Sequence, residues 1–313
     1  MLMLGCPRLP PEDSKPKGAQ RKALWTLVAW WRDPSQYATT TEIGTESKGR
    51  GAFCYYSCKA KMRSFRIATY NIHKFRGIDR RVRPQRIAEV LKQTGADIIA
   101  LQEVVGMDEG TRERNHIRAI AEELGFDFRI GENRRLRGGA YGNAVLTRLP
   151  IVAHRNYDIT WRGKEARGCL QVAVAYEDGE RKNAQGVLQI YNLHLGTAFF
   201  ERRYQARRLL DQDLLGDRAE ISSPRIVLGD LNEWTRGLAS RLLSRHFNTA
   251  SPRQYFGRAW SYPGILPFLH VDHIYYDSLL ELKNITVHRS RLALVASDHV
   301  PLVADFAIPS TPG

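Results

Sequence analysis

Short runs of apolar and β-branched residues recur along the chain from residue 65 onward. Runs of this kind are typical of β-strands, and several are apolar throughout, which indicates strands buried on both faces. The runs are Phe65–Tyr70, Asp97–Leu101, Asn143–Thr147, Leu170–Tyr176, Val187–Leu193, Arg225–Leu228, Val271–Tyr275 and Leu302–Phe306. A chain with so many short buried strands must fold around one or more β-sheets.

Three segments between these runs have the periodicity of amphipathic helices. Pro84–Gln93 begins with proline, which is favoured in the first helical turn, and its Ile87 and Val90 fall on one face. His116–Leu124 and the Arg-rich Phe200–Leu215 have similar patterns. Because strands outnumber helices and the two do not alternate strictly, the pattern favours an α/β (α+β) four-layer sandwich over a Rossmann fold or a barrel. In this sandwich, two packed and mostly antiparallel β-sheets are flanked by helices.

Residues 1–64 differ in composition from the rest of the chain. They mix Pro-rich and Lys-rich stretches with a Trp-rich patch and a Ser/Thr/Gly run. We expect this extension to be disordered or poorly packed, apart from a short helix around Ala23–Trp31, and residues 65–313 to form one domain. Met62, just before the first predicted strand, is an alternative start of translation.

The formal net charge is +14, and residues 65–313 keep +8 of it, from 36 basic and 28 acidic side chains. A basic protein favours phosphate-bearing partners such as nucleic acid or anionic lipid. The predicted domain contains only Cys169, so it cannot form an internal disulfide. No run approaches the roughly 18 apolar residues of a transmembrane helix, and we expect a soluble, cytoplasmic protein.

Polar residues cluster at the ends of the predicted strands, where loops can position a site on a rigid base. The segments are Asn71-Ile72-His73, Gln102-Glu103, Asn192-Leu193-His194, Gly229-Asp230-Leu231-Asn232, Val271-Asp272-His273 and Ser297-Asp298-His299. Taken singly, each has a structural explanation, because Asn and Asp are common in turns and helix caps. Together, so many carboxylate, amide and imidazole groups would cost stability unless a metal ion or a substrate offset their repulsion.

This mixture suits phosphoryl chemistry with a hard cation, because carboxylates bind Mg²⁺, His carries protons or charge, and Asn orients water. Residues 65–313 contain no His-x-x-x-His or paired Cys of a zinc site and no Gly-x-Ser-x-Gly nucleophile motif. They also lack the Gly-x-x-x-x-Gly-Lys-Ser/Thr phosphate loop. The pattern therefore does not suit a zinc enzyme or a serine acyl transferase, and it excludes nucleotide-triphosphate motors.

In their order, these segments resemble the endonuclease/exonuclease/phosphatase superfamily, which has the DNase I-like fold, over about Phe65 to Ala307. The matching segments are Thr69-Tyr70-Asn71-Ile72, Leu101-Gln102-Glu103, Tyr141-Gly142-Asn143-Ala144-Val145-Leu146-Thr147, Asn192-Leu193-His194-Leu195, Gly229-Asp230-Leu231-Asn232, Val271-Asp272-His273-Ile274 and Ser297-Asp298-His299. One segment alone is a weak signal, but all of them in order are specific. Within the superfamily the chain is most similar to small bacterial members of unassigned substrate.

The resemblance implies a metal site and a carboxylate that activates water. Glu103 is the implied main ligand of Mg²⁺, with Mn²⁺ as an alternative, and Asn71 and Asp298 lie close to the metal. Asp230 is implied to orient or deprotonate the attacking water, helped by Asn232. The implied reaction is hydrolysis of phosphodiester bonds, which depends mainly on in-line positioning and on stabilisation of charge on the phosphoryl oxygens.

The resemblance also implies two imidazoles and a phosphate site. His299 is paired with Asp272, which fixes its tautomer and raises its basicity. His194 faces the phosphate from the other side and protonates the leaving oxygen. Arg167 matches a basic position that binds phosphate in relatives, and Asn143 helps to hold the same phosphate.

Two further histidines are ambiguous. His73 stands where some relatives carry a metal-binding carboxylate and others do not, and we favour a role in supporting the metal ligands over plain packing. His273 follows Asp272, but neighbouring side chains of a strand point to opposite faces, so only one of the two can enter the site. We choose Asp272.

Two segments bear on the substrate. Residues 133–137, Asn-Arg-Arg-Leu-Arg, are predicted to be a basic loop that grips neighbouring phosphates if it lies at the rim, although a solvated charged loop is the more common outcome. The apolar segment Tyr262–Leu269 runs into Asp272 and either contacts lipid tails or bases, or packs under the sheet.

These features leave three functions open. The basic charge favours a Mg²⁺-dependent nuclease of the endonuclease type. The apolar segment favours a phosphodiesterase or phosphatase acting on phospholipid or sphingolipid headgroups, and the same charge would suit an anionic membrane surface. A non-catalytic binding module is disfavoured because the full set of acid, base and metal residues is present. We expect nucleic acid as the partner, anionic membrane lipid as the alternative, and no protein partner.

Overall fold

The structure of the protein is a computed structural model, and it describes residues 64–107, 115–136, 139–177, 185–216, 223–233, 237–251, 260–264 and 268–309. The extension predicted for residues 1–64, its helix at Ala23–Trp31 and the alternative start at Met62 lie outside the described residues, apart from Ser64, and remain predictions. Within the described ranges, no helix is long and apolar enough to cross a membrane.

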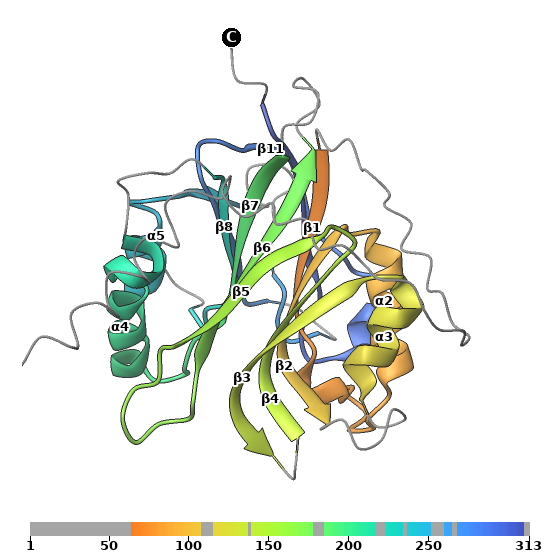
Figure 1. The fold of residues 1–313 in the computed structure, drawn as a ribbon. Helices are drawn as coiled ribbons and strands as arrows, with labels where there is room; N and C mark the ends of the chain where they lie inside the picture. The colour runs from red at the N-terminus through yellow and green to blue at the C-terminus, as the bar shows by residue number, and fades with distance from the viewer. Residues whose placement is uncertain are drawn as a thin grey trace, which may run out of the picture. The chain divides into compact units, whose positions relative to one another are not determined.

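Two six-stranded β-sheets form the body of the domain (Figure 1). The first sheet has the order β11 (Glu281–Val287), β12 (Leu302–Ala307), β1 (Ser64–Asn71), β2 (Ile98–Met107), β4 (Gly139–Thr147), β3 (Asp127–Leu136). The second has the order β5 (Ile151–Asp158), β6 (Gly168–Glu177), β7 (Gln185–His194), β8 (Arg225–Asp230), β10 (Asp272–Tyr276), β9 (Asn248–Ala250). Each sheet has one parallel pair, β1 with β2 and β7 with β8, and its other pairs are antiparallel.

Helices cover the outer face of each sheet (Figure 1). On the first sheet lie α2 (Pro84–Thr94), α3 (His116–Leu124) and the short α7 (Ala293–Ala296), and on the second lie α4 (Phe199–Arg208) and α5 (Leu238–Leu243). The 3-10 helix η2 (His73–Phe75) follows β1, and the π-helical turn η4 (Gln212–Gly216) follows α4. The order helix, sheet, sheet, helix confirms the predicted four-layer sandwich.

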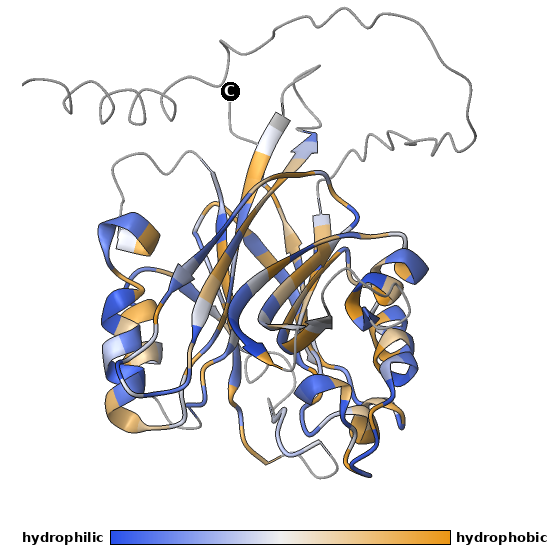
Figure 2. Cartoon of the chain, turned by 60° about the horizontal axis from the view of Figure 1, so that its bottom comes forward, coloured by the Kyte–Doolittle hydropathy of each residue, from blue (hydrophilic) through white to orange (hydrophobic). Residues whose placement is uncertain are grey.

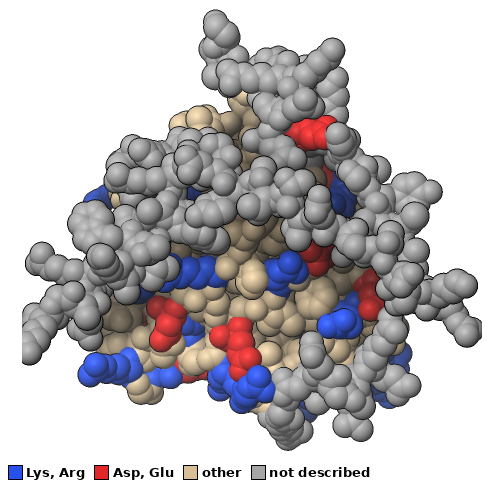
Figure 3. All heavy atoms as spheres, viewed as in Figure 1, with Lys and Arg blue, Asp and Glu red and all other residues tan. Residues whose placement is uncertain are grey.

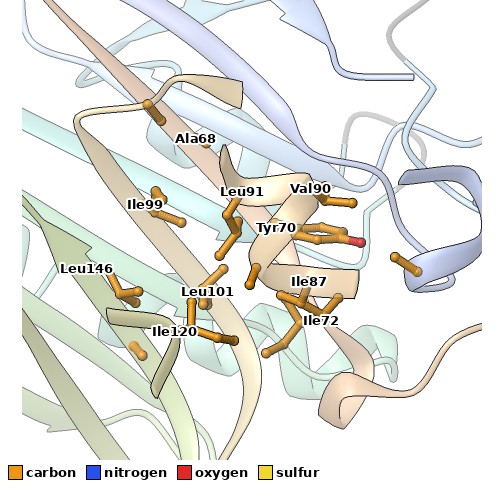
Figure 4. Packing of buried hydrophobic residues seen from close by; sticks show 14 of the residues in the cluster. Ala68, Tyr70, Ile72, Ile87, Val90, Leu91, Ile99, Leu101, Ile120 and Leu146 are labelled. Carbon is orange, nitrogen blue, oxygen red and sulfur yellow. The ribbon is translucent and has the colours of Figure 1, made fainter. Parts of the chain in front are cut away.

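Helix α2 illustrates how the sequence sets this arrangement. Pro84 opens the helix, Ile87 and Val90 are fully buried, and Gly95 ends the helix in the left-handed conformation at φ 61°. Figure 4 shows Val90 beside Tyr70 of β1 and Ile87 beside Ile72, in the same apolar cluster as Ile99 of β2. In Figure 2 the helices carry polar and apolar residues on different faces. Burial of one such side chain contributes roughly 1.5–3 kcal/mol, which holds the helix on the sheet.

The inner faces of the two sheets meet in a separate apolar core. It includes Ile67 of β1 and Val145 of β4 from the first sheet, and Val172 of β6, Ile190 of β7 and Ile274 of β10 from the second. All five side chains are completely buried. The near-continuous apolar runs of the sequence therefore belong to strands that are covered by the other sheet on one side and by helices on the other.

The two parallel pairs determine where the polar strand ends meet. Parallel strands have their carboxyl ends at the same edge, and β1 and β2 place Asn71 beside Gln102. Strands β7 and β8 place His194 beside Asp230, and β10 places Asp272 on the other side of Asp230. A hydrogen bond from Asn71 to Asp230 joins the two sheets at this edge. The polar strand ends found in the sequence thus share one edge of the sandwich.

Two predictions of secondary structure are wrong in detail. The helix predicted over Phe200–Leu215 ends at Arg208, where the guanidinium pairs with Asp213 across the break and the chain turns so that Leu214 is buried on the second sheet. The basic loop predicted for residues 133–137 is a strand as far as Leu136, because it pairs with β4 at the edge of the first sheet. Residue 137 lies outside the described ranges.

Candidate active site

The carboxylate of Asp230 is the centre of a polar cluster at this edge. Its Oδ2 accepts a hydrogen bond from Asn71 Nδ2 at 3.1 Å and lies 3.5 Å from His194 Nε2 and 3.6 Å from His299 Nε2. Its Oδ1 accepts a hydrogen bond from the backbone N–H of Asn232 at 2.8 Å. Four residues predicted from separate segments of the sequence therefore contact one buried carboxylate.

Glu103 also contacts Asn71. The Asn71 Nδ2 donates to Glu103 Oε1 at 3.4 Å, so one amide touches the carboxylates of both Glu103 and Asp230. Glu103 has a left-handed backbone, φ 56°, at an irregularity in the pairing of β2 with β4 between Leu101 and Val104. Such a bulge re-aims a side chain away from the regular ladder, and here it directs the carboxylate to the site edge.

The charge of Glu103 is stabilised by its surroundings. Its Oε2 accepts a hydrogen bond from Lys74 Nζ at 2.6 Å. Burial acts to raise the pKa of Glu103, but the hydrogen bond from Lys74 and the charge of its ammonium oppose burial, and the pKa lies below its usual value. Glu103 is therefore ionised at neutral pH, as a ligand of a divalent cation must be.

His299 lies between two carboxylates. Its Nδ1 is 2.9 Å from Asp272 Oδ2, and its Nε2 faces Asp230. Burial acts to lower the pKa of His299, but Asp272 and Asp230 together raise it to about 10, so the ring is an imidazolium at neutral pH. Ser261 donates a hydrogen bond to Asp272 at 2.5 Å, and the ring of Tyr262 lies 4.9 Å from that of His299. These contacts hold the ion pair in place.

Burial also perturbs Asp230. It raises the pKa of this carboxyl, and although His299 opposes the effect, Asp272 adds to it, so the pKa lies above its usual range. A carboxylate with a raised pKa accepts a proton more readily near neutral pH. Asp230 therefore has the electrostatics of a general base.

Arg167 determines the tautomer of His194. The Arg167 Nη1 lies 2.9 Å from His194 Nδ1, and because a guanidinium can only donate, Nδ1 must be the acceptor. The ring proton is then on Nε2, which faces Asp230. Burial and the charge of Arg167 lower the pKa of His194 well below its usual value, so the ring is neutral. The Asn232 Nδ2 lies 3.1 Å from Nε2 and donates to Leu195 O at 2.8 Å.

Asp298 and His73 lie beside Asn71. The backbone N–H of His73 donates to Asn71 Oδ1 at 3.0 Å, and His73 Nδ1 is 3.5 Å from Asp298 Oδ1. Ser297 donates to the backbone carbonyl of Asn71 at 2.8 Å. About a third of the Asp298 side chain is exposed, so its carboxylate is open to a ligand. This position suits the supporting role predicted for His73.

Asn143 lies between the two sheets. Its buried Nδ2 donates to Gly168 O at 3.0 Å and to Asn192 O at 3.2 Å, which uses both amide hydrogens. Asn192 in turn donates to Leu101 O at 2.9 Å and to Ala144 O at 2.8 Å. These amides join the sheets behind the site, and Asn143 does not offer a donor to a phosphate.

His273 points away from the cluster, as the alternation of side chains along a strand predicts. Its Nε2 donates to the backbone carbonyl of Glu233 at 3.1 Å, and its ring packs against His270 with the centroids 4.4 Å apart. Asp272, its neighbour in β10, is the residue that enters the site.

Three neighbours of the site were not among the residues predicted from the sequence. Lys74 contacts Glu103, Ser261 contacts Asp272, and Glu165 pairs with Arg167 at 3.0 Å. Lys74 directly follows the predicted segment Asn71-Ile72-His73, and Glu165 precedes Arg167 by two residues. Closeness in sequence to a predicted site residue could therefore have indicated both. Ser261 directly precedes the apolar segment Tyr262–Leu269, but nothing in that segment indicated a hydrogen bond to Asp272.

The backbone around the site is strained. Asn232 has φ 51°, and His73 and Lys74 of η2 have φ 43° and 57°. At Gly229, φ is 139° and a Cβ would collide with the carbonyl oxygen of Leu193. For the three non-glycine residues such conformations cost about 1–3 kcal/mol each, and they cluster at functional sites. Their position at this edge is independent support for a functional site here.

Two adjacent groups of side chains could hold a metal ion. One is the ionised carboxylate of Glu103 with Asn71 hydrogen-bonded to it and the partly exposed Asp298 beside His73. The other is Asp230, Asp272 and His299, whose ligand atoms lie within 4.8 Å of one another. In the second group both ring nitrogens of His299 face carboxylates, so the imidazolium already supplies the positive charge. In the first group Lys74 contacts only one oxygen of Glu103, and the carboxylate of Asp298 is partly open to solvent, so hard oxygen donors remain available there.

The family model for the Endonuclease/Exonuclease/phosphatase family matches residues 68–299. The Uncharacterized protein YbhP of Escherichia coli (strain K12) is 28% identical over 252 residues, which are 78% of this chain and 96% of YbhP. A solved endonuclease/exonuclease/phosphatase from Beutenbergia cavernae has a TM-score of 0.60 at 22% identity and covers 80% of this chain and 73% of its own. The mannosyl-6-phosphatase Bt3783 of Bacteroides thetaiotaomicron has a TM-score of 0.61 at 16% identity, over 78% and 99%. The family match contains every site residue from Asn71 to His299.

Proposed function

The chain belongs to the endonuclease/exonuclease/phosphatase family, whose members hydrolyse phosphoester bonds, and we propose that it is a divalent-metal-dependent phosphodiesterase that acts on nucleic acid as an endonuclease. The observation that carries the proposal is the convergence of Asn71, Asn232, His194 and His299 on the carboxylate of Asp230. This arrangement supplies an acceptor for a proton and donors for a negatively charged phosphate in one buried cluster.

Glu103 is the main metal ligand in this proposal, with Asn71 and Asp298 beside it. A divalent cation at Glu103 would neutralise charge on the phosphoryl oxygens. We take this cation to be Mg²⁺, with Mn²⁺ as a replacement, because the donors are hard oxygen atoms. The low pKa of Glu103 and the exposure of Asp298 support this assignment.

Asp230 orients the attacking water and accepts its proton. The hydrogen bonds from Asn71 and from the Asn232 backbone fix the carboxylate, so that its direction does not depend on the substrate. The raised pKa of Asp230 allows it to take up a proton as the water attacks. Asn232 also holds the backbone carbonyl of Leu195 next to His194, which keeps the two loops together.

His299, Arg167 and His194 stabilise the charge that develops on the phosphate. The imidazolium of His299 and the guanidinium of Arg167 are fixed cations in a buried environment, where electrostatic stabilisation is strongest. His194 is neutral and presents its Nε2 hydrogen, so we assign it a hydrogen bond to the leaving oxygen. Asn143 has no role in the proposal because its donors are used between the sheets.

The choice of nucleic acid rests on the basic side chains nearest to the site, which include Lys74 and Arg167. Elsewhere the charges give less guidance, since basic and acidic side chains lie intermingled on the face drawn in Figure 3. The lipid alternative rests on Phe268 of the apolar segment, whose residue is 56% exposed. The cytoplasmic location and the lack of a protein partner stay predictions.

The purified full chain, assayed with Mg²⁺ or Mn²⁺ against plasmid, single-stranded DNA, RNA, bis(p-nitrophenyl) phosphate and phospholipid vesicles, tests the proposal. We expect turnover of nucleic acid, and losses on the order of 10²–10³ in rate for His299→Ala and Glu103→Gln. The exposed His154→Ala on β5 is the matched control and should leave the rate unchanged. Robust turnover by both site variants, or turnover of lipid alone, contradicts the proposal.

A further inference from the structure

The ring of Tyr141 on β4 has two cations over it from different elements. Lys74 Nζ of η2 is 5.5 Å from the ring centroid, and Arg134 Cζ of β3 is 4.8 Å from it. The two positive charges are therefore at most about 10 Å apart. Tyr141 itself is only 2% exposed, so the ring is a rigid base for both side chains. Strands β3 and β4 lie side by side in the lower part of Figure 1.

This pair of cations is connected to the candidate active site on both sides. Lys74 donates to the metal ligand Glu103. Arg134 pairs with one oxygen of Glu165 at 2.5 Å, and the other oxygen of Glu165 accepts from Arg167 Nη2 at 3.0 Å. Arg167 contacts His194, so a continuous chain of contacts joins Arg134 to the catalytic imidazole.

The pair has binding capacity that the protein does not use. The Nε atoms of Arg134 and Arg167 are buried without a hydrogen-bond partner in the described part of the chain. An unpaired buried N–H is unfavourable, so neither guanidinium has all its donors satisfied by the described part of the protein. The side chains of Lys74 and Arg134 are 39% and 38% exposed, so a ligand can reach them from solvent.

The charges also leave room for an anion. Three cations, Lys74, Arg134 and Arg167, face two carboxylates, Glu103 and Glu165. The proposed function assigns Glu103 to a divalent cation, and Lys74 has no other ion-pair partner within the described ranges. The region around Tyr141 is then positively charged and suits a phosphate, which a guanidinium binds with two parallel hydrogen bonds.

We propose that Lys74 and Arg134 form a second phosphate subsite, separate from the site of the scissile phosphate, that holds the neighbouring phosphate of a nucleic-acid strand. This inference rests on the proposed function and deepens it, because it requires a substrate with a second phosphate close to the bond that is cut. A strand of nucleic acid carries such a phosphate at every step, and a phospholipid with a single phosphodiester does not.

The test compares the full chain and its Arg134→Ala variant on two substrates. One is bis(p-nitrophenyl) phosphate, which has a single phosphate, and the other is a short single-stranded DNA. Removal of Arg134 should raise KM for the DNA about 10-fold, because a charge-assisted hydrogen bond to phosphate is lost. Its effect on kcat/KM for the single-phosphate substrate, which reports any disturbance passed through Glu165 to Arg167, should be much smaller than the effect on the DNA. Arg134→Lys, which keeps the charge, should recover part of the loss.

Arg135→Ala is the matched control. Arg135 is the next residue of β3 and pairs with Glu132 at 3.0 Å, not with Glu165. The variant should leave both substrates unaffected. Equal effects of Arg134→Ala on both substrates, or no effect on either, would each overturn the second subsite alone. A wild type that cleaves the single-phosphate substrate but no DNA contradicts the choice of nucleic acid in the proposed function, and the second subsite with it. A wild type that cleaves neither substrate refutes the proposed function itself.

Discussion

Replacing Asp272 by Asn tests whether His299 is held as an imidazolium between two carboxylates. The substitution preserves shape and removes the charge that lies 2.9 Å from His299 Nδ1. A charge-assisted hydrogen bond of this kind contributes about 1.5–3 kcal/mol, and one pKa unit corresponds to about 1.4 kcal/mol. The pKa of His299, raised to about 10 in the wild type, should therefore fall by about 1–2 units in Asp272→Asn.

The assay is an NMR titration of histidine ring signals in the full chain, with His299→Ala used to assign the resonance. Asp305→Asn removes a carboxylate on β12 that is paired with Arg66; it is the control and should not move the His299 titration. A wild-type His299 that titrates near its ordinary value of 6.5, or an unchanged pKa in Asp272→Asn, would refute the reasoning.

The same variant makes a prediction about stability. Because the folded-state pKa of His299 is raised, its ion pair contributes stability that is fully present below about pH 6.5 and is lost as the pH rises toward 10. Asp272→Asn should therefore lower the free energy of unfolding more at pH 6 than at pH 10. Urea denaturation at the two pH values measures this difference, and an equal loss at both would count against the ion pair.

Two further predictions concern Asp230 as the general base and Asn192 as the residue that joins the two sheets. The value of kcat/KM on DNA should rise with pH as Asp230 ionises, around pH 6, and should fall as His299 loses its proton toward pH 10. A value of kcat/KM that does not change between pH 5 and 8 would contradict the role of Asp230. Asn192→Ala removes the side-chain hydrogen bonds to the carbonyls of Leu101 and Ala144 and should lower the free energy of unfolding by about 2–4 kcal/mol in urea denaturation. The substitution of the exposed Asn248 by Ala should change the free energy of unfolding by less than about 0.5 kcal/mol. An equal effect of both variants would contradict the role of Asn192 in joining the sheets.

The apolar patterns of the sequence were sufficient to predict the central strands and helices α2 and α3. They did not predict edge strands such as β5, because residues like His154 and Arg155 face solvent there and the alternation of apolar side chains is lost. The break after Arg208 was also missed, since it depends on where Leu214 meets the second sheet. Local periodicity reports burial, and it carries no signal where an element is exposed or where tertiary packing bends it.

For the site, the order of motifs predicted which residues gather at one edge. It could not predict that the side-chain amide of Asn143 donates to backbone carbonyls of the second sheet, or that Arg167 fixes the tautomer of His194. Both depend on contacts between segments that are distant in sequence. The positive φ of Glu103 likewise arises from an irregularity in strand pairing that no local pattern shows. The order of motifs therefore predicted the set of polar residues, and the contacts between distant segments were needed to assign each residue its role.

The most direct test of the central claim is the position of a bound cation. A crystal of the full chain soaked in Mn²⁺ should give an anomalous-scattering peak about 2.1 Å from a carboxylate oxygen of Glu103, and the Glu103→Gln variant should lose it. A peak held by Asp272 and His299 instead, or one that persists in Glu103→Gln, would contradict the assignment of Glu103 as the metal ligand and of His299 as the fixed cation.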